Sequence, residues 1–465
     1  FARVLKRKKN SRLERDDKRN NSWYRVRRET DFVPHIALLG SGGGQRAAVA
    51  LLGSLHQMEK DALLGTILYL GGVSGSTWSM ISLYNDTEWS SNTDRALSKL
   101  WGPGVELEQA AAWLAERAKD EDFSLTDVWG VLTSFLVFLQ MDLRYLSEEA
   151  NRTASNPYPV YCAIEKLCFS EGSIEGKWFE VTPHEAGFPE LGLFVPTSLL
   201  GSKFERGELL EKKLEMDMVK LQGTDFLLRS ACSVSPPTIV IRLCTVVKPG
   251  LIQQSNQSNW RLADDIICQS QWQFPLAGVI VNGISYEVDK NRFLVCRIYS
   301  PIPACLHGQQ QFHLMDAGLM LNVGYPSFLG VKRDVDLIIT LEYSAGTMFE
   351  TLTLAKEYAA AVKKPFPEID ANILEERLWP KDCYVFEGLG GAPSIVYMPL
   401  FNQQNCKGLF YGEFTTFQRP YNQEKINFLL ETAKANIQRN KGVLLREMKK
   451  AVLSRQRKKG WYQTG

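Results

Sequence analysis

The sequence predicts an α/β fold with a largely parallel sheet, because two consecutive strand–loop–helix units stand near its start. Residues 35–39 (HIALL) form a short apolar run typical of a buried strand, and the glycine-rich stretch 40–44 separates it from a helical composition over 46–60. A second apolar run at 66–70 enters the stretch GGVSGS, and another helix is expected from Thr77.

Segments further along the chain fit the same fold class. The pattern over 95–150 is helical, residues 239–247 and 335–340 have the composition of strands, and a long helix is expected from Gln423. The polar stretch 250–260 (GLIQQSNQSNW) is a candidate lid, with an ordinary surface insertion as the alternative.

Composition limits the class of protein. Of 465 residues, 45 % are hydrophobic and 23 % charged, so the chain can bury a sizeable core. Its longest apolar runs, such as FLVFLQM, fall far short of the roughly 18 residues that a membrane span needs. The nine cysteines have no metal-ligand spacing, so we expect reduced thiols and no metal site.

Charge is distributed unevenly although the net charge is only +2. Residues 1–28 hold 12 Lys/Arg and 3 acidic residues, and residues 439–465 hold 9 Lys/Arg and 1 acidic residue. Two basic ends predict contact with an anionic surface, with solvated tails as the alternative. Few aromatic residues and no nucleic-acid motif accompany them, so anionic lipid is favoured and no nucleic-acid partner is expected.

The first glycine-rich loop, SGGGQR (41–46), presents backbone amides at the positive end of a helix, which favours an anion. A P-loop would end in GK[ST], but QRA follows here. A dinucleotide-binding turn matches formally as GxGxxA (42–47), but the acidic residue expected after the second strand is replaced by LGG (70–72). An oxyanion hole is the third interpretation.

The second loop resembles a nucleophile elbow, in which small residues around a serine permit a sharp strand-to-helix turn. Ser74 has the small neighbours, although Ser76 stands where the last glycine of GxSxG would be. Both loops would lie at the carboxyl edge of a parallel sheet, so we expect Ser74 to approach the amides of Gly43 and Gly44.

A nucleophilic serine needs a base, and the five histidines offer no obvious one. His35 opens a strand and His56 lies within a helix, so both are expected to be structural; the remaining three are His184, His307 and His313. Asp316, in the run HLMDAGL, follows an apolar strand and could act as the base if an apolar pocket raised its pKa. A turn or cap role is the alternative for this aspartate.

Together, SGGGQRA (41–47), GVSGSTW (72–78) and MDAG (315–318) resemble the catalytic motifs of the cytosolic, group IV phospholipases A2. Residues 178–207 and VDLIITLEYSAG (335–346) resemble further blocks of that family. The similarity spans most of the chain, and the amino-acid sequences of the motifs are most similar to those of the gamma type.

The resemblance implies a patatin-like α/β fold with a mostly parallel or mixed sheet, flanking helices and a cap or lid insertion. It implies that Ser74 is the nucleophile, that Asp316 is its base, and that no histidine takes part. It further implies that Gly43 and Gly44 supply oxyanion-hole amides and that Arg46 binds the substrate phosphate.

The resemblance also implies hydrolysis of fatty acyl esters of glycerophospholipids or lysophospholipids, without a cofactor or metal. A calcium-binding module and a C-terminal prenylation box are not seen, so neither a calcium requirement nor a lipid anchor is expected. We expect a basic leader (1–30), a catalytic domain (31–438) and a basic tail (439–465), in a cytoplasmic protein at intracellular membranes. The alternatives are an inactive lipid-binding protein of the same fold and, disfavoured by the missing acid, a dinucleotide-dependent enzyme.

Overall fold

The structure is a computed structural model, and it describes the chain in ranges separated by gaps. The expected leader (1–30), the expected strand at 239–247 and the candidate lid (250–260) lie outside the described residues. The described residues are 33–101, 106–120, 123–137, 141–151, 156–205, 208–224, 302–306, 312–344, 348–405, 414 and 421–460.

The chain divides into two compact units, and each is described by itself. The first comprises Phe1–Trp101, Asn151–Val160 and Leu321–Gly465, and the second comprises Gly102–Ala150 and Tyr161–Met320.

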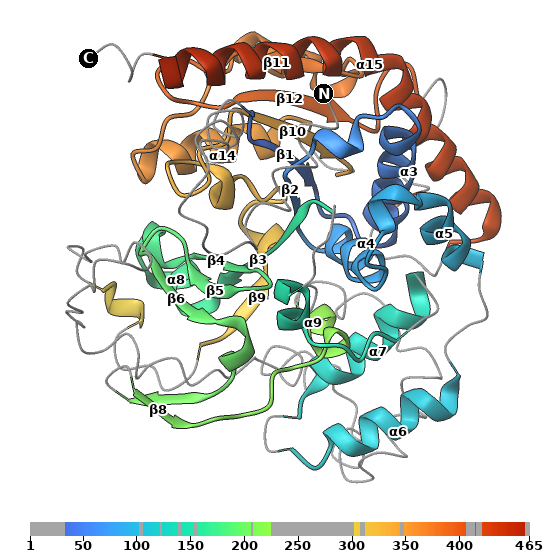
Figure 1. Cartoon of the computed structure of the whole chain (residues 1–465), viewed down its shortest axis with the longest axis vertical. Coiled ribbons are helices and arrows are strands. Elements are labelled where there is room, and N and C mark those ends of the chain that lie inside the picture. The colour runs from blue at the N-terminus through green and yellow to red at the C-terminus, as the bar shows by residue number, and fades with distance from the viewer. Residues whose placement is uncertain are drawn as a thin grey trace, which may run out of the picture. The chain divides into compact units, whose positions relative to one another are not determined.

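The first unit is built on a mostly parallel sheet whose strands lie in the order β11-β12-β10-β1-β2 (Figure 1). These strands are β1 (Ile36–Gly40), β2 (Tyr69–Gly72), β10 (Leu337–Glu342), β11 (Tyr384–Phe386) and β12 (Ser394–Pro399). Among these five, β11 alone runs antiparallel to its neighbour. The IALLG run of β1 is buried at every residue, as expected for a parallel strand covered on both faces.

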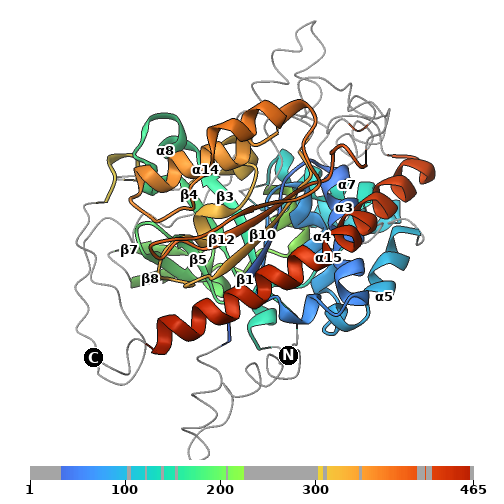
Figure 2. The same cartoon turned by 90° about the horizontal axis from the view of Figure 1, so that it is seen from above.

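Helices cover both faces of this sheet, and Figure 2 shows α14 on one side of β10 and β12 and α15 on the other. Within the described residues, the α-helices of the unit are α3 (Gln45–Lys60), α4 (Gly75–Tyr84), α5 (Thr93–Ser98), α14 (Glu350–Ala361) and α15 (Gln423–Gly460). Buried residues recur along α15 every three to four positions, which is the period of one helix face. It includes Leu429, Leu430, Ala433, Ile437, Leu444 and Met448.

The boundary expected between residues 438 and 439 falls inside α15. Several cations of the expected basic tail bind acidic residues of the first unit: Lys441 Nζ lies 2.8 Å from Asp61 Oδ1, and Arg455 Nη1 lies 3.3 Å from Asp336 Oδ2. A basic composition alone therefore did not distinguish a solvated tail from a helix whose cations are paired.

The second unit contains consecutive antiparallel strands in the order β3-β4-β5-β6. These are β3 (Tyr158–Glu165), whose first three residues belong to the first unit, β4 (Trp178–Val181), β5 (Glu185–Phe188) and β6 (Leu193–Pro196). The short strand β9 (Leu314–Asp316) pairs antiparallel with β3, and β7 (Lys203–Glu205) pairs with β8 (Glu208–Glu211).

Helices of the second unit form a separate small core. The described α-helices of the second unit are α6 (Leu107–Arg117), α7 (Leu125–Val137), α8 (Lys166–Glu171) and α9 (Met218–Thr224). The core packs α6, α7 and α9 around Ala110, Leu114, Val128, Val131, Met141 and Val219.

The expectation of a mixed α/β fold with a mostly parallel or mixed sheet and flanking helices is confirmed.

The expectation that the cysteines are reduced is wrong for one pair. Cys168 of α8 and Cys305 form a disulfide in the second unit across 137 residues of sequence. Spacing along the chain could not reveal this pair, because connectivity does not follow from the order of cysteines.

Among the described residues, no helix combines the length and apolarity needed to cross a bilayer. The same residues hold no group of three or more His, Cys, Asp or Glu side chains placed to bind a metal ion.

Candidate active site

Ser74 stands at a sharp turn between β2 and α4. Its backbone angles are φ 51° and ψ −125°, a combination that residues with a side chain rarely adopt. This is the strained strand-to-helix geometry of a nucleophile elbow, which holds the serine away from both flanking elements. The side chain is 4 % exposed, so its surroundings are largely dehydrated.

Close packing against the first glycine loop explains the small residue that follows Ser74. A Cβ atom on Gly75 would lie 2.0 Å from the Gly44 carbonyl oxygen, so only glycine fits there. The turn is fixed from the helix side because the Thr77 hydroxyl donates to the Ser74 carbonyl oxygen at 2.5 Å.

The first glycine loop repeats the geometry of the elbow. Gly44 precedes α3 with φ 58° and ψ −138°, close to the angles of Ser74. Because β1 and β2 are parallel neighbours with Gly40 opposite Gly72, both loops leave the same edge of the sheet. The two loops therefore present helix amino termini, with their unpaired N–H groups, at one place.

The structure brings Ser74 next to the loop that carries Gly43 and Gly44. A Cβ atom on Gly42 would lie only 2.9 Å from the Ser74 Cβ atom. An anion formed at the serine would thus be close to the amino ends of α3 and α4, where backbone amides and helix dipoles favour negative charge.

Ser76, which departs from the GxSxG pattern, joins the two loops. Its hydroxyl donates to the Ser41 carbonyl oxygen at 2.6 Å, and both residues are fully buried. Further along α4, the Ser79 hydroxyl donates to the Ala48 carbonyl oxygen of α3 at 2.5 Å. These two serines hold the elbow helix against the glycine-loop helix.

Arg46 lies one residue into α3 and is 1 % exposed. Its Nε donates to the Tyr343 carbonyl oxygen at 2.6 Å, and Nη1 donates to the Phe414 carbonyl oxygen. A Cβ atom on Gly43 would lie 2.7 Å from Nη2, so the guanidinium covers this part of the glycine loop. Burial is the main cause that lowers the pKa of Arg46 from its ordinary value.

Asp316 ends β9 in the second unit, where it lies opposite Ala163 of β3. Its carboxylate accepts a hydrogen bond from the Gly318 backbone N–H at 2.7 Å and caps the 3₁₀ turn Ala317–Leu319. The aspartate therefore has the cap geometry, and its side chain is partly buried. Ser74 belongs to the first unit and Asp316 to the second.

Two of the histidines have structural contacts. His35 precedes β1, at the strand end opposite the glycine loop, and its backbone N–H donates to Asp336 Oδ2 at 2.8 Å. His56 Nε2 lies 2.9 Å from Asp94 Oδ1 on α5. Neither is placed at the edge of the sheet where Ser74 stands.

Sequence reasoning missed Asn322, which contacts the backbone of the glycine loop at Gly42. Its backbone carbonyl oxygen accepts from the Gly42 N–H at 3.0 Å, and its side chain reaches the same residue. The sequence offered one indication of its role, its position six residues after Asp316.

Comparisons with known proteins agree with these features. A family model described as the lysophospholipase catalytic domain matches residues 106–233. Human cytosolic phospholipase A2 gamma is 29 % identical over 91 % of this chain and 91 % of its own length, and the mouse protein is 26 % identical over 91 % and 87 %. Human cytosolic phospholipase A2 zeta is 30 % identical over 80 % of this chain and 49 % of its own.

A solved structure shares the fold. The human GIVD cytosolic phospholipase A2 superposes with a TM-score of 0.71 at 24 % identity over 97 % of this chain. The match covers 63 % of that protein's chain, slightly less than two thirds. The matched family model, the relatives aligned over nearly the whole chain and the shared fold lead to one conclusion: the chain is similar to the cytosolic phospholipases A2 in sequence and in fold.

Proposed function

We propose that this protein hydrolyses fatty acyl esters of glycerophospholipids or lysophospholipids through an acyl-serine intermediate on Ser74. The observation that carries the proposal is the strained backbone of Ser74, packed against a glycine loop at the amino ends of two helices. Strain of this kind persists only where the surrounding structure enforces it, and it gathers at functional sites.

In the proposed reaction, the Ser74 hydroxyl oxygen attacks the ester carbonyl carbon while Asp316 accepts its proton. The amides of Gly43 and Gly44 stabilise the negative charge that develops on the carbonyl oxygen. The lysolipid or glycerol derivative leaves as the alcohol after it takes up that proton. Asp316 then activates a water molecule, which releases the fatty acid and restores the serine.

Asp316 is proposed as the base because it occupies the MDAG motif, and because its backbone is anchored in β9. The Gly318 N–H that binds its carboxylate would orient the aspartate rather than neutralise it. We expect Asp316→Asn to remove turnover while Ser74 stays in place.

Arg46 is proposed to bind the substrate phosphate, since a guanidinium recognises phosphate oxygens well and Nη2 lies beside Gly43. Its partners include the backbone carbonyl oxygens of Tyr343 and Phe414 and the side chain of Tyr421. A lipid phosphate would therefore have to compete with the Phe414 carbonyl group for Nη1. Arg46→Lys should raise KM for a phospholipid more than for an ester without a phosphate.

Substitution of the serine tests the proposal. Ser74→Ala should abolish hydrolysis of a defined mixed-acyl phospholipid and labelling by a fluorophosphonate probe, because both need the serine oxygen. Ser98→Ala, on exposed α5, is the matched control and should retain both. An active Ser74→Ala variant would refute the mechanism. A wild-type protein that binds lipid vesicles without labelling or turnover would instead be a lipid-binding protein.

The chemistry itself uses a serine and a carboxylate, so we propose that calcium is not required and no cofactor takes part. Activity should be unchanged in EGTA.

We also propose that the basic ends attract the protein to anionic membranes in the cytoplasm. Binding to phosphatidylserine vesicles should fall steeply between about 50 and 500 mM salt, since salt screens such attraction.

A further inference from the structure

Asn322 binds both backbone polar groups of Gly42, the residue before the proposed oxyanion-hole amides. The Gly42 N–H donates to the Asn322 carbonyl oxygen at 3.0 Å, and Asn322 Nδ2 donates to the Gly42 carbonyl oxygen at 3.2 Å. All of these groups lie in the first unit.

The side chain of Asn322 and the proposed nucleophile both lie on the side of Gly42 to which a side chain would project. A Cβ atom on Gly42 would lie 2.2 Å from Asn322 Oδ1 and 2.9 Å from Ser74 Cβ. The asparagine side chain therefore lies close to the serine, over the space that only a glycine leaves open, and a shift of this side chain would disturb the loop beside Ser74.

The contact with the Gly42 carbonyl group has a directional consequence. The carbonyl of Gly42 and the N–H of Gly43 belong to the same planar trans peptide, in which they point in opposite directions. The groups that hold the Gly42 oxygen thus set the direction of the Gly43 N–H, and they include Asn322 Nδ2 and the Ser41 hydroxyl, each at 3.2 Å. A run of glycines has little conformational preference of its own, so this direction must be imposed from outside.

Asn322 is itself held in place by a chain of hydrogen bonds at the end of β10. Its Nδ2 donates to Ser344 Oγ at 2.6 Å, and the Ser344 N–H donates to Glu342 Oε1 at 2.9 Å. Glu342 is 1 % exposed, and its other carboxylate oxygen accepts from the Thr351 hydroxyl at 2.6 Å. The glycine loop is thereby connected to the buried framework of the sheet.

We propose that Asn322 is a positioning residue for ester hydrolysis, which holds the Gly42–Gly43 peptide so that the Gly43 N–H points at the developing oxyanion. The role rests on the proposed function, because it belongs to that reaction. Asn322 acts through the loop and not on the substrate.

Asn322→Ala removes the amide donor to the Gly42 carbonyl oxygen and keeps both the Ser41 hydroxyl donor and the backbone contact of residue 322 to Gly42. We expect kcat to fall about 10- to 100-fold, less than the loss of an oxyanion donor itself but typical of a misplaced one. KM should stay within about threefold, because the ground-state ester makes little use of the oxyanion contact. Turnover of a lysophospholipid in mixed micelles is measured per active site, titrated with a fluorophosphonate probe.

Asn322→Asp tests the hydrogen bond rather than the volume. The side chain keeps its size, but an ionised carboxylate presents an acceptor to the Gly42 carbonyl oxygen instead of a donor. Its kcat should fall at least as far as that of Asn322→Ala. Wild-type kcat in Asn322→Asp would overturn the proposal, since donation to Gly42 would then be unnecessary.

Asn402→Ala is the matched control in the same unit. Asn402 is fully buried, and its Nδ2 donates to the Pro399 carbonyl oxygen at 2.7 Å and to Asn436 Oδ1 at 3.2 Å, remote in sequence from the glycine loop. This variant should lose stability and keep kcat per titrated site. If Asn322→Ala behaves in the same way, Asn322 is only structural and the proposal fails.

The outcome separates the two proposals. Active wild-type protein with fully active Asn322 variants would overturn the positioning role alone. Wild-type protein without turnover or labelling that depends on Ser74 would overturn the proposed function and the positioning role together. A selective loss of kcat in both Asn322 variants, with Ser74→Ala inactive, supports both.

Discussion

Ser74 combines the two features that a nucleophile elbow needs, an unfavourable backbone conformation and small neighbours. Its φ of 51° costs of order 1–3 kcal/mol for a residue with a side chain. The contacts of Thr77 and the approach of Gly44 to Gly75 keep the turn in place. The residue therefore lowers the stability of the protein, and its backbone conformation places the serine at the sheet edge beside the glycine loop.

Ser74→Gly should separate stability from activity. Glycine adopts positive φ without strain, so we expect the free energy of unfolding to rise by about 1 kcal/mol, while hydrolysis is lost with the hydroxyl group. Urea denaturation of Ser74→Gly beside Ser74→Ala measures this, because alanine keeps the strain. Equal stability of the two variants would show that the backbone at this position is not strained.

Ser76 shows what the departure from the GxSxG pattern does in this fold. Ser76→Gly would restore the GxSxG pattern, but it removes the hydroxyl that donates to the buried Ser41 carbonyl oxygen. We expect a loss of about 1–2 kcal/mol in the free energy of unfolding, since a buried acceptor is left unpaired. Thermal unfolding of Ser76→Gly checks this, with Ser98→Ala as the exposed control; a gain in stability would contradict the role assigned to the hydroxyl.

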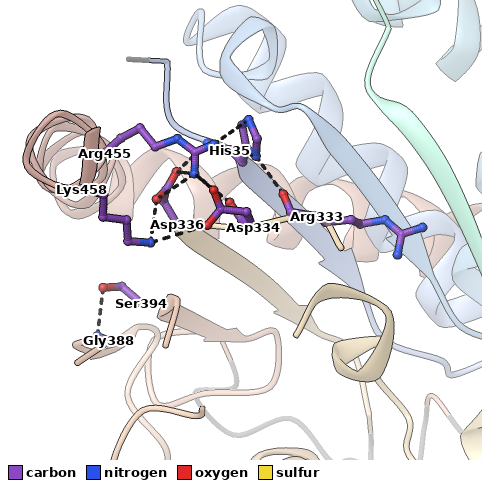
Figure 3. A network of polar contacts seen from close by, with 8 residues as sticks. All are labelled: His35, Arg333, Asp334, Asp336, Gly388, Ser394, Arg455 and Lys458. Carbon is purple, nitrogen blue, oxygen red and sulfur yellow. Dashed lines mark hydrogen bonds and ion pairs between the residues drawn. The ribbon is translucent and has the colours of Figure 1, made fainter. Parts of the chain in front are cut away.

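At the scale of elements, the carboxyl-terminal part of α15 is fastened to the amino ends of β1 and β10 (Figure 3). Arg455 is 4 % exposed, and its guanidinium contacts Asp334, Asp336 and the His35 ring. Lys458 Nζ lies 3.2 Å from Asp336 Oδ1. A long helix with basic residues is therefore held at its end by ion pairs around the buried Arg455 and Asp336 as well as by its apolar face.

Arg455→Met should destabilise the first unit by about 1.5–3 kcal/mol, because it removes one charged partner of the buried Asp336 carboxylate, which keeps Lys458 Nζ and the His35 N–H. Lys449→Met is the control on the same helix. The Lys449 side chain is exposed, so the change should stay within about 0.5 kcal/mol. Urea unfolding of both variants measures the difference; equal values would show that the Arg455 cluster adds nothing.

The sequence predicted local elements better than their partners. The two strand–loop–helix units and the apolar face of α15 follow from patterns within a few residues, because backbone geometry repeats over short distances. The contact of Asn322 with Gly42 spans 280 residues, and nothing near either residue indicates the other. Arg46 likewise looks like an ordinary surface arginine in the sequence, and its partners from distant segments show that it is buried.

At the scale of the whole molecule, the fold class was predictable but the covalent link in the second unit was not. The expected reduced thiols follow from compartment and spacing, which are statistical arguments. Cys168 and Cys305 meet because α8 and the turn Ala304–Leu306 pack together in the second unit. Such proximity depends on the path of the chain between them and not on the local sequence.

Reduction of the Cys168–Cys305 disulfide should destabilise the second unit and leave the first unchanged. The bond closes 137 residues, and the chain-entropy estimate for such a loop is about 5 kcal/mol. Hydrogen exchange with and without a phosphine reductant should show faster exchange in β4 and α8 and constant protection in β1 and β10. Cys383→Ser, which alters a thiol outside the bond, is the control and should change neither. Peptide mapping without reduction should recover the two cysteines as one linked peptide; their separate alkylation in the untreated protein would contradict the bond.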